Sequence, residues 1–98
     1  MREDCIREAF RFEGRVQGVG FRATTAAIAN DFDLDGWVRN EPDGTVRCEV
    51  QGSPASIEAF LSRLQRRMSE NIRSMSRDSR EIEAALGRFD VRRGPLGR

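Results

Sequence analysis

The chain contains no lysine, no histidine and no tyrosine, so all 17 of its basic residues are arginines. Without histidine and lysine, the sequence excludes Ser-His-Asp triads, histidine acid–base catalysis, Schiff-base lysines, the lysine of a Walker A loop and histidine metal ligands. Any catalysis must therefore use arginine, asparagine, carboxylates, cysteine or backbone N–H groups.

Cysteine and long apolar runs are scarce too. The two cysteines, Cys5 and Cys48, match no CxxC or metal-ligand spacing, and we interpret them as unpaired strand residues, with a disulfide or a reactive thiol as the alternatives. No apolar run approaches the length of about 18 residues that a membrane span requires, and no signal-peptide pattern opens the chain. We therefore expect a cytoplasmic protein with no membrane partner, no metal ion and no cofactor.

The 98 residues are enough for one domain and too few for two. We expect this domain to span residues 1–93 and residues 94–98 to form a flexible tail. Apolar residues make up 38% of the chain and charged residues 34%, with a net charge of +1, which favours neither disorder nor general polyanion binding. Any affinity for phosphate must therefore be local.

Hydrophobic periodicity predicts the element order βαββαβ. Alternating apolar and polar residues predict strands, which span residues 6–13, 34–40, 45–51 and 88–92. Helical spacing predicts one helix from Phe21 and a second from Pro54, which Ser53 caps. The first helix should end near residues 31–33, where Asp33 accepts a left-handed cap conformation less easily than glycine.

The remaining segments complete a two-layer fold. Residues 41–44 carry Pro, Asp and Gly in the order of a type I turn that ends in a left-handed residue, which predicts a β-hairpin. Residues 69–80 are polar enough for a further, twisted edge strand, and a solvated loop should follow it. Two helices at this spacing can cover one face of an antiparallel sheet, so the expected fold is an α+β, ferredoxin-like βαββαβ sandwich.

The segment between the first strand and the first helix has the pattern of a phosphate-binding loop. It contains Gly14, Gly18 and Gly20 and ends in Arg22. Flexible residues let consecutive N–H groups converge on one point, the N-terminus of a following helix points the same way, and an arginine adds a planar charged fork. The glycines alone are also compatible with a simple tight turn, and Arg22 with a solvated side chain. A cation in the first helical turn opposes the helix dipole, however, which favours an anionic partner.

A second block, Gly36-Trp37-Val38-Arg39-Asn40, lies in the second predicted strand. Period two places Asn40 in line with buried neighbours, although an asparagine there could merely begin the hairpin turn. We expect Trp37 to pack against the sheet and Arg39 to be a surface charge.

Together the two blocks resemble the acylphosphatases, ferredoxin-like enzymes that hydrolyse the carboxyl–phosphate bond. Both occur in the family's order, with a helix-sized interval between them and an Asp43-Gly44 turn after them. The resemblance covers residues 10–65 well and the C-terminal third loosely. The chain departs from the family in having Asp33 where glycine is more common, a more polar and arginine-rich segment over residues 69–87, and no tyrosine near its end.

The resemblance implies a metal-free and cofactor-free hydrolysis of small acyl phosphates to a carboxylate and inorganic phosphate. It implies that Arg22 binds the phosphoryl group and that Asn40 positions the attacking water, while the substrate's phosphate helps to take the water's proton. It also implies that the phosphate contacts come from Arg15, Val16, Gln17, Gly18, Val19 and Gly20. We expect a monomer that is inhibited by inorganic phosphate.

Two other functions are compatible with this fold. The loop could hold phosphate or carbamoyl phosphate without turnover, as similar domains do within hydrogenase-maturation proteins, although this chain ends at Arg98 without their cysteine clusters. An RNA-binding ferredoxin-like module would present several exposed aromatic residues on its sheet. Because only Trp37 qualifies, we expect no nucleic-acid partner.

Overall fold

A computed structural model describes residues 4–84 and 86–92, in which seven elements follow one another. The elements are β1 (Ile6–Gly14), α1 (Phe21–Asp31), β2 (Asp35–Asn40), β3 (Val46–Gly52), α2 (Pro54–Arg67), β4 (Ile72–Arg80) and β5 (Asp90–Arg92). The predicted strands and helices are therefore present at nearly their expected positions. The expected tail at residues 94–98, and the domain boundary at residue 93, lie outside the described residues.

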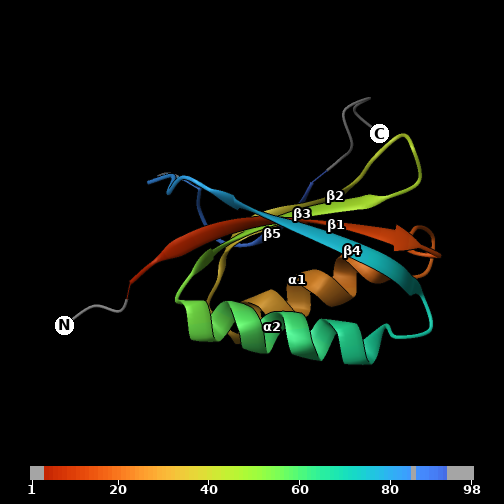
Figure 1. Cartoon of the computed structure of the whole chain (residues 1–98), viewed down its shortest axis with the longest axis horizontal. Coiled ribbons are helices and arrows are strands. Elements are labelled where there is room, and N and C mark those ends of the chain that lie inside the picture. The colour runs from red at the N-terminus through yellow and green to blue at the C-terminus, as the bar shows by residue number, and fades with distance from the viewer. Residues whose placement is uncertain (1–3, 85, 93–98) are drawn as a thin grey trace.

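The strands form one sheet in the order β4-β1-β3-β2-β5, and both helices cover the same face of it (Figure 1). This confirms the ferredoxin-like α+β fold. The first four strands in this order are antiparallel to their neighbours, as expected, but β5 runs parallel to β2. The parallel direction follows from the path of the segment before β5. The Gly36 N–H donates to the Gly87 carbonyl at 3.1 Å, and Arg88 forms a bridge with Asp35. The chain therefore enters β5 beside the start of β2.

The core lies between the sheet and the helices. Alternation along β1 and β3 directs Phe12, Val46 and Cys48 toward the helices, and each is fully buried. The apolar stripe of α2 fills the opposite side through Ile57, Phe60, Leu61 and Leu64. The end of β1 is joined to the start of α1 by the packing of Phe12 against Phe21, whose ring centroids are 5.2 Å apart.

The helix ends follow the sequence signals. Ser53 caps α2 by accepting a hydrogen bond from the Ser56 N–H at 3.1 Å, and Pro54 occupies the first turn. α1 has no side-chain cap, because Gly20 occupies its N-cap position in the left-handed conformation. Asp33 also has a left-handed backbone, with φ of 54°, just after the end of α1.

The opposite face of the sheet, which the helices leave open, is partly covered by the segment after β4. The Gln51 side chain exchanges two hydrogen bonds with the backbone of Glu83, and Arg7 donates to the Glu81 carbonyl at 2.9 Å. The side chains of residues 81–84 are exposed, as expected for a loop, but the backbone of this segment is docked on β1 and β3. Glu49 and Gln51 are consequently buried.

Trp37 packs on this open face, as expected, and is 6% exposed. The guanidinium groups of Arg39 and Arg92 lie over its ring, 4.8 and 5.2 Å from the ring centroid. Arg39 is more than the surface charge that the sequence predicts, because it is half-buried and its Nε donates to Glu41 at 2.6 Å.

Both cysteines are free thiols, as interpreted from their spacing, but only Cys48 is a strand residue, because Cys5 precedes β1. Cys48 is buried in the central strand β3, and this burial raises the pKa of its thiol. Neither helix of the described residues has the length and apolar character to cross a membrane.

Candidate active site

A cavity of about 230 Å³ opens where β1 and β2 end and α1 begins. The topology creates this meeting point. β1 and β2 are both antiparallel to β3, so their C-terminal ends share one edge of the sheet. The loop that leaves β1 therefore turns into α1 beside the last residue of β2. The cavity is lined by Val16, Gly18, Gly20, Phe21, Arg22, Ala23, Asn40 and Val91.

The loop supplies unpaired backbone donors. The N–H of Arg15 donates to the Asn71 carbonyl at 2.8 Å, and the Asn71 side chain returns a hydrogen bond to the Arg15 carbonyl at 3.0 Å. Beyond this anchor, none of the described residues accepts a hydrogen bond from the N–H groups of residues 16–20. The first N–H groups of α1 add to them, since a helix start has no acceptor one turn earlier. The loop and the helix start thus form a concave set of donors suited to an anion.

Two glycines give the loop this shape. Gly18 and Gly20 have φ values of 76° and 79°, a backbone region that residues with a Cβ avoid. A Cβ at either position would meet no atom within 4 Å, so the backbone conformation, and not lack of space, requires glycine there. The left-handed turn at Gly20 leads directly into the first turn of α1.

Arg22 lies in that first turn, half-buried at the wall of the cavity. Its Nη1 donates to the Arg92 carbonyl at 3.4 Å, which ties the side chain to the end of β5. A guanidinium beside the positive end of a helix dipole is unfavourable without an anion. The rest of its planar fork matches two oxygens of a phosphoryl group.

Asn40 ends β2 on the other side of the cavity. Its Oδ1 is buried and has no hydrogen-bond partner among the described residues. An unmet buried acceptor costs about 1–3 kcal/mol, so the described residues leave the hydrogen-bonding capacity of this oxygen unused.

Gln17 connects the loop to the hairpin that follows Asn40. Its Nε2 donates to the carbonyl oxygens of both Glu41 and Thr45, at 2.9 Å each. The amide therefore fixes the distance between the loop and the end of β2.

The structure brings together five of the sequence-predicted site residues, which line the cavity: Val16, Gly18, Gly20, Arg22 and Asn40. Arg15, Gln17 and Val19 do not line it. The backbone of Arg15 is engaged by Asn71, the side chain of Gln17 turns toward the hairpin, and Val19 is 39% exposed.

Sequence reasoning missed the part that β5 plays, through the Val91 side chain and the Arg92 carbonyl. The short strand β5 is distant in sequence and carries no polar motif, so no local pattern indicates its position beside the site.

Residues 8–91 match the family model described as Acylphosphatase. A curated acylphosphatase from Synechococcus sp. (strain JA-2-3B'a(2-13)) is 39% identical over 89 residues, which cover 91% of this chain and 95% of that protein. The crystal structure of acylphosphatase from Bacillus subtilis is similar with a TM-score of 0.78 at 25% identity, over 88% of this chain and 97% of that one.

A solved structure of T. kodakarensis HypF is similar over 94% of this chain but only 12% of its own, with a TM-score of 0.76 at 26% identity. The match to the family model over most of the chain, and a relative of almost the same extent, establish its family. The chain belongs to the acylphosphatase family and is an enzyme of the hydrolase class.

Proposed function

We propose that this enzyme hydrolyses small acyl phosphates at the cavity between α1 and β2. The observation that supports the proposal is that one small cavity is lined by a loop whose N–H groups have no acceptor, by Arg22 and by Asn40, whose side-chain oxygen has no partner. The first two groups suit a phosphoryl group and the third suits a water molecule beside it. Phosphoryl transfer requires mainly such positioning and charge stabilisation.

The phosphoryl group binds in the loop. N–H groups of the loop residues that line the cavity and the fork of Arg22 donate to its non-bridging oxygens, and they stabilise the charge that spreads over these oxygens in the transition state. Gly18 and Gly20 let the backbone approach closely enough to make these bonds.

A water molecule donates one hydrogen to Asn40 Oδ1 and is thereby directed at phosphorus. As the new P–O bond forms, the bond from phosphorus to the acyl oxygen breaks and its electron pair leaves with the carboxylate. The second hydrogen of the water passes to a phosphoryl oxygen of the substrate. Because a carboxylate is a good leaving group, no general acid is needed, which agrees with a site built without histidine or lysine.

The cavity also limits the substrate. A volume of about 230 Å³ holds a phosphoryl group with a short acyl chain. The lining also includes Ala23 and Val91, which favour an apolar acyl group. We further propose that the enzyme works as a cytoplasmic monomer without a metal ion, cofactor or nucleic-acid partner, and that inorganic phosphate is its product and competitive inhibitor.

The direct test compares an aryl acyl phosphate with a phosphate monoester, each with and without a chelator. We expect hydrolysis of the acyl phosphate, little or none of the monoester, unchanged rates with the chelator, and competitive inhibition by phosphate. Strong inhibition by the chelator would contradict the metal-free reaction.

A second function, phosphate or carbamoyl-phosphate binding without turnover, is favoured by one observation: a region of HypF from T. kodakarensis has a similar fold. Phosphate binding by a folded protein that leaves every acyl phosphate intact would identify this function and overturn the first.

A further inference from the structure

Four arginines lie directly opposite one another across four neighbouring strands on the open face of the sheet. Arg11 of β1 pairs with Arg47 of β3, Arg47 pairs with Arg39 of β2, and Arg39 pairs with Arg92 of β5. With strands about 4.8 Å apart, this arginine row is about 14 Å long. Like charges placed directly opposite destabilise a sheet. Anions beside the row would offset this repulsion between the arginines.

The protein's own carboxylates balance the row unevenly. Arg39 has a close partner in Glu41, at 2.6 Å. Arg47 is 3.6 Å from Glu49, which is also engaged by Arg7, and Arg11 is 3.9 Å from the exposed carboxylate of Asp43. The side chains of Arg11 and Arg47 are 45% and 29% exposed. These two guanidinium groups thus keep most of their donors for an external partner.

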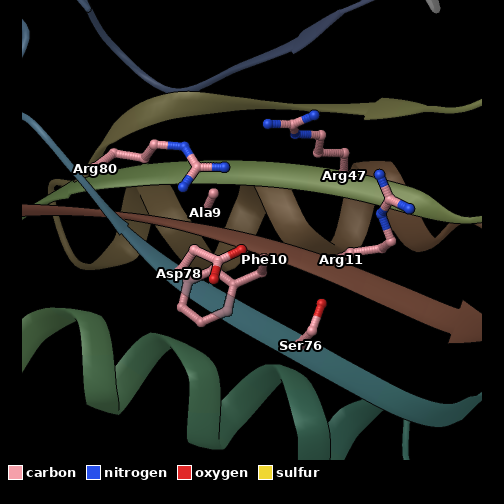
Figure 2. Close-up of a pocket in the computed structure, with 7 residues that line it drawn as sticks. All are labelled: Ala9, Phe10, Arg11, Arg47, Ser76, Asp78 and Arg80. Carbon is pink, nitrogen blue, oxygen red and sulfur yellow. The ribbon is translucent and has the colours of Figure 1, made fainter.

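A hollow of about 280 Å³ lies at the end of the row that Arg11 and Arg47 form. Its rim includes the side chains of Arg11, Arg47 and Arg80, which come from β1, β3 and β4, with the small side chain of Ala9 between them (Figure 2). Arg80 forms no salt bridge with any residue that the structure describes, and its Nη1 donates to the carbonyl of its neighbour Ser79. The hydroxyl of Ser76, opposite Arg11, adds a further polar group. The carboxylate of Asp78 also lines the hollow, so three guanidinium groups face one carboxylate there, and the excess of positive charge suits an oxyanion.

The neighbouring side chains restrict the shape of the anion. Carboxylates flank the row on the same face, with Glu49 and Asp90 on one side and Glu13 on the other. Between these carboxylates only a narrow anion fits along the row. Trp37 lies in a flanking row, but Arg39 and Arg92 cover its ring, so it offers no platform for a nucleobase.

We propose that the arginine row, from the hollow at Arg80 toward Arg92, binds a linear oligophosphate chain, either free or as the tail of a nucleotide. The planar forks of the row match phosphoryl oxygens repeated along a narrow chain. Among the described residues none lines both the hollow at Arg80 and the cavity at Arg22. The far end of the row adjoins that cavity, because the Arg92 carbonyl accepts a hydrogen bond from Arg22. The inference does not depend on the proposed hydrolysis.

Calorimetric titration with sodium tripolyphosphate tests the site on three variants. Arg11→Gln/Arg47→Gln removes two charges from the row, and Arg66→Gln/Arg67→Gln removes two from the exposed end of α2 as a matched control. Arg22→Ala removes the arginine of the cavity. Loss of two charge-assisted hydrogen bonds should weaken binding about tenfold or more, whereas the control should change it less than about threefold and Arg22→Ala should leave a tripolyphosphate site intact.

Unchanged affinity in the row variant would overturn the proposal, as would loss of all tripolyphosphate binding in Arg22→Ala. Removing opposed like charges should not lower the melting temperature. If the row variant nevertheless unfolds, amide NMR of the wild type decides: tripolyphosphate should shift residues 9–11, 47 and 76–80, and shifts confined to residues 16–23 would contradict the site.

Two further probes show whether the bound oligophosphate is free or belongs to a nucleotide. Equal affinities for adenosine triphosphate and tripolyphosphate would support a free oligophosphate, and a clear preference for the nucleotide would support a nucleotide tail. A single-stranded RNA oligonucleotide that binds more tightly than both, and through Arg11 and Arg47, would assign the row to nucleic acid and overturn the proposal.

Discussion

The side-chain amide of Gln17 donates to the backbone carbonyl of Thr45 at 2.9 Å, across the gap between the loop after β1 and the hairpin after β2. A second bond from the same nitrogen reaches the Glu41 carbonyl. Arg22 follows the loop and Asn40 precedes the hairpin, so this amide links the two segments that carry the catalytic candidates.

Replacement of Gln17 by methionine, which has a similar shape and no donor, should therefore lower both stability and activity. The two carbonyls keep other partners, the N–H groups of Gly44 and Glu41. We expect a loss of about 1–3 kcal/mol in the free energy of unfolding and a lower kcat/KM. Denaturant unfolding and kinetics measure both, and Gln65→Met on the exposed face of α2 is the control. Unchanged kinetics in Gln17→Met would show that the amide does not position the site.

Arg22→Ala should impair binding and chemistry together. In the proposed mechanism the guanidinium contacts the phosphoryl group in the ground state and in the transition state, so the variant should raise KM, lower kcat and lose thermal protection by phosphate. We expect a loss in kcat/KM on the order of 10²–10³. Arg22→Lys should not restore activity, because a point charge cannot reproduce the bidentate fork. Full activity of the lysine variant would rule out that geometry.

Asn40→Ala should separate chemistry from phosphate binding. Because the proposed contact of Asn40 is with water, kcat should fall by a factor on the order of 10²–10³ while the inhibition constant of phosphate stays near that of the wild type. Removal of an unmet buried oxygen should not reduce thermal stability. Asn30→Ala, an exposed asparagine on α1, is the matched control. A fully active Asn40→Ala enzyme would contradict the mechanism while leaving the fold unaffected.

Asp33→Gly should stabilise the protein without changing its kinetics. A left-handed backbone is unfavourable for aspartate, and glycine relieves this while adding entropy to the unfolded chain, which leaves a gain of about 0.5–1 kcal/mol. Ala27→Gly, at an exposed site inside α1, should instead destabilise by about 1 kcal/mol. Denaturant midpoints compare the two, and equal losses in both variants would disprove the strain at Asp33.

Asp43 should contribute to stability at neutral pH and lose this contribution in acid. The side chain and the N–H of Thr45 donate to its Oδ1, at 2.7 and 3.0 Å, and lower its pKa below the ordinary value of 3.8. Because the folded pKa is the lower one, the contribution is present above 3.8 and disappears as the pH falls through the folded pKa. The difference in unfolding free energy between wild type and Asp43→Asn should therefore shrink below pH 3.8. A constant difference would refute this.

Much of the fold was predictable because periodicity and turn chemistry act locally. A short stretch of sequence is enough to predict the alternation in β1 and β3 and the apolar stripe of α2. The same holds for the turn at Gly44, which has φ of 93°. The parallel direction of β5 was not predictable, because a strand of three exposed residues has little pattern and its pairing depends on the path of the preceding segment.

The same distinction applies to the candidate site, where the sequence predicts some residues but not the contacts between distant segments. Gly18, Gly20, Arg22 and Asn40 could be selected because their residue types reflect backbone shape and chemistry, and the cavity contains them all. The anchoring of Arg15 by Asn71 and the amide bridge of Gln17 are contacts between distant segments, and neither residue shows these partners in its neighbours. The structure also reveals opposed arginines that the overall charge of +1 conceals.

Because Cys48 is completely buried, the rate of its chemical modification reports on opening of the fold. The thiolate is the form of cysteine that attacks thiol reagents, and this thiol lies in the middle strand of the sheet with no exposed surface and a raised pKa. Cys5, near the start of β1, is partly accessible. In one labelling reaction, the modification rate of Cys5 therefore gives the reactivity of a thiol that is accessible in the folded protein. The rate at which Cys48 is modified records how often the central sheet opens.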